Sequence, residues 1–230
     1  MAPSLTELAN HYGSDKGDIV GNAHNYTLLY QFLFEQWRTH SFSFLEIGLE
    51  RGEIVEYRNR ERPVTDAPSV RMWLDYFPLA QCYGFDNADF TFLQLPRFTF
   101  IRGDLSSKPD LRAAARIVPD LRFVVDDGSH ASWHQQSAFI QLFPKIEPAG
   151  YYLIEDLDFQ PPYEAQLPRC EKTADIFLEF AKTQKLRLSN VADEVRQEIE
   201  SGIGNILIFR GGSAEVGLAP VKMIGIQKAG

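Results

Sequence analysis

Two short acidic clusters hold the residues of this chain that are best suited to chemistry. The first runs from Asp126 to His130 with the sequence Asp-Asp-Gly-Ser-His, and the second is Glu155-Asp156. Each directly follows an apolar run that is typical of a β-strand. Because ligands bind at the carboxyl ends of strands in open α/β sheets, we expect both clusters at that edge. Carboxylates beside an imidazole predict a divalent metal with a nearby base, a pairing that can activate a hydroxyl group.

The residue types at this predicted site favour magnesium. Mg²⁺ prefers oxygen ligands in octahedral geometry, and calcium or manganese could also fit, whereas zinc is disfavoured because only one histidine is near. The alternative is that the acids are helix caps and turns, but matching clusters after adjacent strands favour a metal. His134 follows His130 by four residues, yet Ser129 or Ser132 is expected to cap a helix between them. We therefore do not expect the two histidines to bind a metal as a pair.

Three further strand ends have the pattern of a nucleotide pocket. A strand ending in Glu46 turns at Gly48 and enters a charged loop at 51–68. Asp86 ends the next strand, where a carboxylate can accept two hydrogen bonds from a ribose diol. Asp104 ends the third strand and could bind an adenine amino group. Each motif alone is equally typical of an ordinary turn or helix cap, so its significance comes from its place in the row.

Alternating strands and helices indicate the fold class. We expect an α/β fold with a Rossmann-like, doubly wound, mostly parallel seven-stranded sheet and an antiparallel C-terminal hairpin. Ser4 and Glu7 have the spacing of a capping box, and Ser69 is expected to cap a later helix. The predicted strands are 42–47, 81–85, 98–102, 121–125, 151–154, 205–209 and 223–227. The predicted helices are 1–12, 26–38, 69–76, 110–117, 132–143, 175–185 and 193–199.

Composition limits the possible partners and location. The chain has 230 residues with a net charge of 23 − 31 = −8, which argues against nucleic acid or an anionic membrane as partner. It has 2 cysteines, which fits a reducing cytoplasm, and no apolar run approaches the roughly 20 residues of a membrane span. We expect a single cytoplasmic domain over residues 1–230.

The row of strand ends resembles the class I S-adenosylmethionine-dependent methyltransferases. More narrowly, the chain resembles the metal-dependent sugar O-methyltransferases of macrolide biosynthesis, of the mycinamicin and demethylmacrocin type. Four motifs in order carry this resemblance, which spans roughly residues 8–160. They are Tyr12-Gly13-Ser14-Asp15-Lys16-Gly17, the segment from Ser69 to Pro78, Val125-Asp126-Asp127-Gly128-Ser129-His130, and Ile154-Glu155-Asp156-Leu157.

The resemblance implies a role for each strand-end residue. It implies Mg²⁺ held by Asp127, Glu155 and Asp156, with His130 as the general base. It also implies that helices in residues 1–40 cover the cofactor and that 157–202 form a substrate lid. The implied S-adenosylmethionine-binding residues are Glu46, Gly48, Asp86, Asp104 and Asp126, with Tyr12, Ser14, Lys16 and Arg71 as further candidates from the cover and from the helix after the charged loop.

The expected activity is Mg²⁺-dependent O-methylation of a hydroxyl group on a small molecule, such as a sugar or a natural-product scaffold. A vicinal diol or a hydroxyl beside a carbonyl is favoured as acceptor, because a second oxygen on the metal would fix the orientation of the acceptor. The expected partner is thus a small molecule with a hydroxyl group, such as a diol or glycoside. Three alternatives stay open: a carboxylate acceptor that gives a methyl ester, a non-methylating enzyme, and a binding module that keeps the cofactor pocket. Whether the chain forms a homo-oligomer also stays open.

Overall fold

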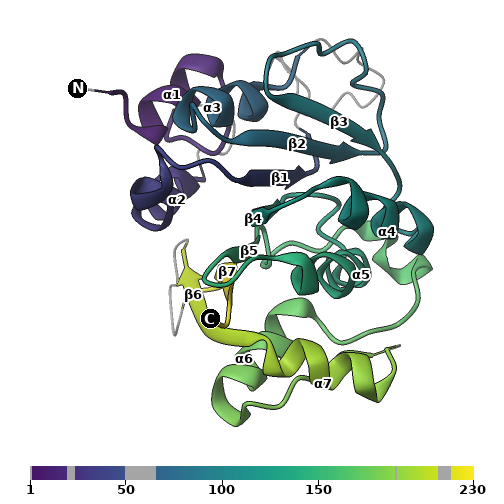
Figure 1. Cartoon of the computed structure of the whole chain (residues 1–230). Coiled ribbons are helices and arrows are strands. Elements are labelled where there is room, and N and C mark those ends of the chain that lie inside the picture. The colour runs from purple at the N-terminus through teal and green to yellow at the C-terminus, as the bar shows by residue number, and fades with distance from the viewer. Residues whose placement is uncertain (1, 20–23, 50–65, 190, 212–218) are drawn as a thin grey trace. The chain divides into compact units, whose positions relative to one another are not determined.

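The computed structural model describes residues 2–19, 24–49, 66–189, 191–211 and 219–230 (Figure 1). The chain forms two compact units, Met1–Arg102 and Gly103–Gly230, and each is described by itself. Most of the predicted charged loop at 51–68 lies outside the described residues. No described helix combines the length and the apolar character needed to cross a membrane.

The first unit contains three parallel strands in the order β3-β2-β1. Its aromatic core is built on β1 and α3, where the ring centroids of Phe44 and Trp73 lie 4.7 Å apart and Phe77 packs beside both. Burial of this cluster explains why an apolar strand and the following helix form together. The elements are α1 (Leu5–Tyr12), α2 (Tyr26–Phe34), the 3₁₀-helix η1 (Glu35–Trp37), β1 (Ser43–Ile47), α3 (Pro68–Tyr76), β2 (Gln81–Asp86) and β3 (Phe98–Arg102).

The helix starts of this unit confirm one capping prediction and correct another. In α1 the Glu7 N–H donates to the Ser4 side chain and the Ser4 N–H donates to the Glu7 carboxylate, at 3.1 and 2.7 Å. The prediction for Ser69 is wrong, because α3 already begins at Pro68. Proline suits a first helical position, since its ring fixes a helical φ. The Ser69 hydroxyl instead donates inward to the buried Glu46 carboxylate at 2.8 Å.

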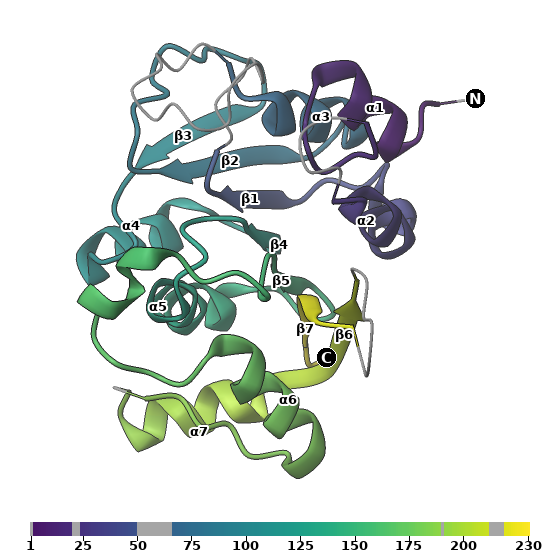
Figure 2. The same ribbon diagram turned by 180° about the vertical axis from the view of Figure 1, so that it is seen from behind.

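The second unit contains four strands in the order β4-β5-β7-β6 (Figure 2). Strands β4 and β5 are parallel, whereas β7 is antiparallel to both β5 and β6, so the predicted terminal hairpin is confirmed. The elements are α4 (Lys108–Ile117), β4 (Leu121–Asp126), α5 (Ser132–Leu142), η3 (Phe143–Lys145), β5 (Tyr151–Ile154), η4 (Pro162–Gln166), α6 (Thr173–Thr183), α7 (Asp193–Ser201), β6 (Ile203–Arg210) and β7 (Val221–Lys228).

The register of β4 and β5 brings the two acidic clusters to one edge. Asp126 pairs with Ile154 at the end of the parallel ladder. The Glu155 N–H then donates to the Asp126 carbonyl at 3.0 Å, so the segments that follow β4 and β5 leave the sheet side by side. Beneath them, Phe139 of α5 packs against Tyr152 of β5 and fixes the helix on the sheet. All seven predicted strands are therefore present in the described part of the chain.

Candidate functional site

Three side chains converge where β4 and β5 end. One ligand atom from each of Asp127, His130 and Asp156 lies within 4.8 Å of the other two. The His130 Nε2 is 4.0 Å from the Asp156 Oδ2, and both side chains are largely shielded from solvent, with 23% and 15% exposed. Two carboxylates at this spacing could hold one divalent cation, with the imidazole beside it as a possible base. We call these three residues the metal cluster.

The backbone at the metal cluster is held in an unusual conformation. His130 has φ of 61° and Asp156 has φ of 50°, both in the left-handed region that residues with a Cβ seldom adopt. Such conformations cost free energy and persist where the surrounding structure fixes them, often at active sites. The surrounding structure therefore fixes the backbone of His130 and Asp156, two of the three residues of the metal cluster.

The environment of His130 fits a histidine that acts on a bound group. Its Nδ1 is buried and has no hydrogen-bond partner within the described ranges, while its Nε2 faces Asp156. Phe159 packs edge-to-face against the imidazole, with ring centroids 5.8 Å apart. A buried polar atom without a partner is uncommon in native proteins, and a catalytic role is one of the explanations for it. The ring is thus held by packing, with a nitrogen directed toward two carboxylates.

Glu155 and Asp126 are more deeply buried than the metal cluster. Glu155 is 1% exposed and lies outside the three-residue group, so its role as a metal ligand stays a prediction. Asp126 accepts a hydrogen bond from the Tyr152 hydroxyl at 2.9 Å, and burial raises the pKa of its carboxyl to about 6. These contacts give Asp126 a part in shaping the end of β4, and its predicted contact with the cofactor stays untested.

The segment after β5 holds the loop that carries the cluster. The Tyr163 hydroxyl donates to the Ser129 carbonyl at 3.2 Å, and the Gln160 amide donates to the His130 carbonyl at 3.4 Å. Both residues belong to the predicted lid, 157–202, of which this first part is therefore fixed to the metal-cluster loop.

The predicted cofactor residue Glu46 is engaged within the first unit. Its carboxylate accepts hydrogen bonds from Ser69 at 2.8 Å and from the Trp73 indole at 3.0 Å, and Lys16 Nζ lies 3.9 Å away. Both Glu46 and Lys16 are buried, at 1% and 2% exposure. This network ties β1 to α3 and to the segment after α1.

We therefore expect Glu46→Ala to destabilise the fold. Removing one partner of a buried ion pair typically costs about 3 to 5 kcal/mol, because the other charge is left without compensation. Thermal unfolding of the variant should occur at a clearly lower temperature than that of the unaltered chain. An unchanged unfolding temperature together with weaker S-adenosylhomocysteine binding would show that Glu46 contacts the cofactor and does not support the fold.

Gly48 and Asp86 shape the turn after β1. Gly48 has φ of 80°, a left-handed conformation that favours glycine, and its N–H donates to the Phe85 carbonyl at 2.9 Å. The Asp86 carboxylate accepts the N–H groups of Leu49 and Ala88, each at 2.7 Å. The side chain predicted to bind ribose thus also fixes the backbone of the glycine turn.

The remaining candidates also have contacts of their own. The Arg71 Nε–H donates to both oxygens of the Asp66 carboxylate, at 2.8 and 2.9 Å, and the Tyr12 hydroxyl donates to Asp75. Ser14 is fully buried. Asp104 belongs to the second unit, where its carboxylate accepts the Ser106 N–H at 2.7 Å. Their predicted roles toward the cofactor stay predictions.

Sequence reasoning did not identify two features of this site, the exposed Phe159 ring beside His130 and the contacts of His134. The His134 ring nitrogens lie 2.7 Å from the Ser106 hydroxyl and 2.6 Å from the Ser129 hydroxyl. The prediction that Ser129 or Ser132 caps the helix is wrong, because α5 begins at Ser132 after Ala131 and has no side-chain cap. The contact between Ser129 and His134 could have been suspected from the sequence, because His134 follows Ser129 by five residues and lies in the first turn of α5.

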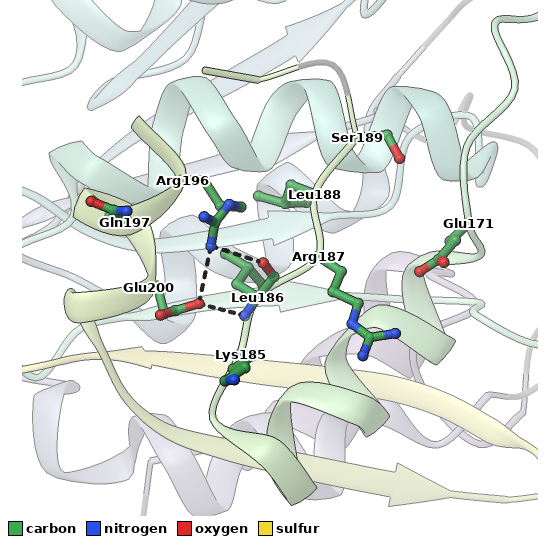
Figure 3. A pocket seen from close by; sticks show the side chains of 9 residues that line it. All are labelled: Glu171, Lys185, Leu186, Arg187, Leu188, Ser189, Arg196, Gln197 and Glu200. Carbon is green, nitrogen blue, oxygen red and sulfur yellow. Dashed lines mark hydrogen bonds and ion pairs between the residues drawn. The ribbon is translucent and has the colours of Figure 1, made fainter. Parts of the chain in front are cut away.

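The second unit also has a pocket of about 570 Å³ between the 185–189 segment and α7 (Figure 3). A hydrogen bond joins its two walls, and an ion pair lies within α7. Glu200 accepts the Leu186 N–H at 2.6 Å and lies 3.6 Å from the Arg196 guanidinium. This pocket lies in the predicted lid, and its side chains suggest no reaction chemistry.

Comparison with known proteins places the fold and the motifs in context. No family model matches the chain. It is 34% identical over 178 residues to the 8-demethyl-8-alpha-L-rhamnosyl tetracenomycin-C 2'-O-methyltransferase of Streptomyces olivaceus, covering 76% of this chain and 44% of that protein. It is 34% identical over 155 residues to the mycinamicin VI 2''-O-methyltransferase of Micromonospora griseorubida, covering 67% of this chain and 36% of that one. This chain is a homologue of natural-product sugar O-methyltransferases.

A solved structure gives the same result over the whole chain. The MycE methyltransferase of the mycinamycin pathway, in complex with Mg and S-adenosylhomocysteine, matches with a TM-score of 0.74 and 26% identity. The match covers 100% of this chain and 55% of MycE. This chain therefore spans about half the length of MycE, and its matches to the two curated relatives above cover less than half of each of them. The predicted Rossmann-like methyltransferase fold and the resemblance stated from the sequence are both confirmed.

Proposed function

We propose that this chain catalyses S-adenosylmethionine-dependent, Mg²⁺-dependent methylation of a hydroxyl group on a glycosylated natural product. The observation that carries this proposal is the convergence of Asp127, His130 and Asp156 at the ends of two neighbouring strands. Relatives named as sugar O-methyltransferases, and a MycE structure in complex with Mg, S-adenosylhomocysteine and mycinamycin VI, support the choice of reaction.

In this proposal Asp127 and Asp156 would hold the cation, and Glu155 would be a further ligand. A divalent cation lowers the pKa of an oxygen bound to it, which makes a hydroxyl group a better nucleophile. His130 accepts the hydroxyl proton at Nε2, and the Asp156 carboxylate 4.0 Å away stabilises the resulting imidazolium. The Phe159 ring holds the imidazole in place throughout.

The cofactor residues proposed are those that the sequence indicates. Gly48 allows the backbone to come close to the cofactor, and Asp86 and Asp104 supply carboxylates for hydroxyl and amino groups. The methyl donor is a sulfonium cation, which an acidic environment suits. The assignment of Gly48 is tested by calorimetry, which compares the binding of S-adenosylhomocysteine by the unaltered chain and by the Gly48→Val variant.

The test of the proposed reaction uses the acceptors named for the relatives. Mycinamicin VI and the rhamnosyl tetracenomycin are incubated with S-adenosylmethionine and MgCl₂, and the products are analysed by mass. A product heavier by one CH₂ unit, with release of S-adenosylhomocysteine and the new methyl group on a sugar oxygen, is expected. Binding of the cofactor without turnover on a broad panel of hydroxyl and carboxylate acceptors would contradict the proposal.

We further propose that Phe159 orients the acceptor. Its side chain is 50% exposed although it lies against His130, so one part of the ring is open beside the metal cluster. Covering roughly 40 Å² of apolar surface between the acceptor and an aromatic ring stabilises the complex by about 1 kcal/mol. Phe159→Ala should therefore raise the KM for the acceptor about fivefold to tenfold, while Phe159→Tyr keeps the ring and serves as the matched control. An unchanged acceptor KM in the alanine variant would exclude this role.

A further inference from the structure

His134 occupies a buried position in the first turn of α5 and touches two separate loops. It is 7% exposed. One ring nitrogen, Nδ1, lies 2.6 Å from the Ser129 hydroxyl, and the other, Nε2, lies 2.7 Å from the Ser106 hydroxyl. Ser129 belongs to the loop between Asp127 and His130. Ser106 belongs to the segment that follows β3, where Asp104 accepts its N–H at 2.7 Å. A single side chain therefore connects both loops.

Burial of His134 would destabilise the fold if its ring nitrogens did not contact Ser129 and Ser106. Burying an imidazole in an apolar environment costs free energy, and each ring nitrogen must have a partner to offset it. Burial lowers the pKa of His134, and the Asp104 charge partly opposes that shift. A leucine would fill similar space at lower cost, so packing alone does not account for a histidine here. The two serine contacts do.

We propose that His134 is a positioning residue, which fixes the metal-cluster loop to the Asp104–Ser107 segment and so sets the geometry of the cation site. The inference rests on the proposed function, because the cation site is part of it. In metal sites, groups that hold the ligands in place typically change metal affinity by about 10- to 100-fold when removed. His134 acts on the loop through Ser129 and does not touch the cation.

The test compares four variants of the full chain, and a fifth, Ser129→Ala, is added for the second readout. His134→Leu removes both contacts. In His134→Asn the short amide reaches the position of Nδ1 and keeps the Ser129 contact, while in His134→Gln the longer amide reaches the position of Nε2 and keeps the Ser106 contact. Gln136→Leu is the matched control, because Gln136 is a buried polar residue of the same helix that donates to the Glu171 carbonyl at 2.7 Å.

The first readout is Mn²⁺ affinity, measured with MnCl₂ by electron paramagnetic resonance. We expect His134→Leu to weaken binding about tenfold or more, and His134→Asn to restore it to within about threefold of the unaltered chain. His134→Gln should remain weak, and Gln136→Leu should leave the affinity unchanged even if it lowers the unfolding temperature. An affinity in folded His134→Leu within threefold of the unaltered chain would overturn the inference.

The second readout is amide hydrogen exchange, which needs no ligand. Peptides covering 127–131 and 104–107 should exchange faster in His134→Leu, and the first of these also in Ser129→Ala, but neither in Gln136→Leu. If the unaltered chain does not bind Mn²⁺, the proposed cation site is wrong, and exchange alone decides whether His134 positions the loop. Unchanged exchange in both peptides of His134→Leu would refute the positioning role.

Discussion

Replacing Asp127 or Asp156 by alanine is expected to reduce methyl transfer by at least about 10³-fold in kcat/KM. Each carboxylate supplies one of the three converging ligand atoms. Loss of the cation removes several kcal/mol of stabilisation from the transition state, and about 4 kcal/mol corresponds to 10³ in rate. Turnover of mycinamicin VI by the purified variants measures the effect, and excess EDTA should have the same effect on the unaltered chain, reversed by MgCl₂.

The matched control for these variants is Asp158→Ala. Asp158 lies two residues after Asp156, but its carboxylate pairs with the Lys222 Nζ at 2.8 Å and it does not belong to the metal cluster. We expect this variant to keep most of its activity. Full turnover by Asp127→Ala, or by the unaltered chain in excess EDTA, would remove the cation from the mechanism.

The second large effect is expected for His130. Proton transfer by a positioned base contributes about 10²- to 10⁴-fold to a rate, so His130→Ala should lower kcat by that factor. Affinity for S-adenosylhomocysteine should change little, because the imidazole faces Asp156 and Phe159. Single-turnover kinetics and calorimetry separate the two effects.

A methyl ester product would lead to a different result. A carboxylate acceptor is already ionised near neutral pH and needs no base. In that case His130→Ala would keep its kcat, and the assignment of His130 as a base would be wrong even though the metal cluster remained necessary.

The sequence predicted the parts of this molecule that depend on local pattern. Apolar runs ending in acids defined β4 and β5, and because parallel strands end at the same edge, the meeting of Asp127, His130 and Asp156 could be anticipated. The Ser4 capping box was equally local. These inferences needed only residue types, spacing and the direction of the strands.

Contacts between distant residues could not be read in the same way. Ser106 and His134 are separated by 28 residues in the chain, and no local pattern indicates that they meet. The contacts of the Glu46 carboxylate with Trp73, Ser69 and Lys16 likewise join segments far apart in the chain. The resemblance implies that Glu46 binds the cofactor, and that role stays a prediction. The left-handed backbone at His130 also depends on the packing around the loop and not on the residue type.

The most direct test of the account is the number and position of bound divalent ions. Electron paramagnetic resonance of the purified chain titrated with MnCl₂ should show one tightly bound ion per chain, lost in Asp127→Ala and in Asp156→Ala and kept in Asp158→Ala. If both cluster variants bind Mn²⁺ as tightly as the unaltered chain, the ends of β4 and β5 do not hold a cation, and the proposed chemistry is wrong.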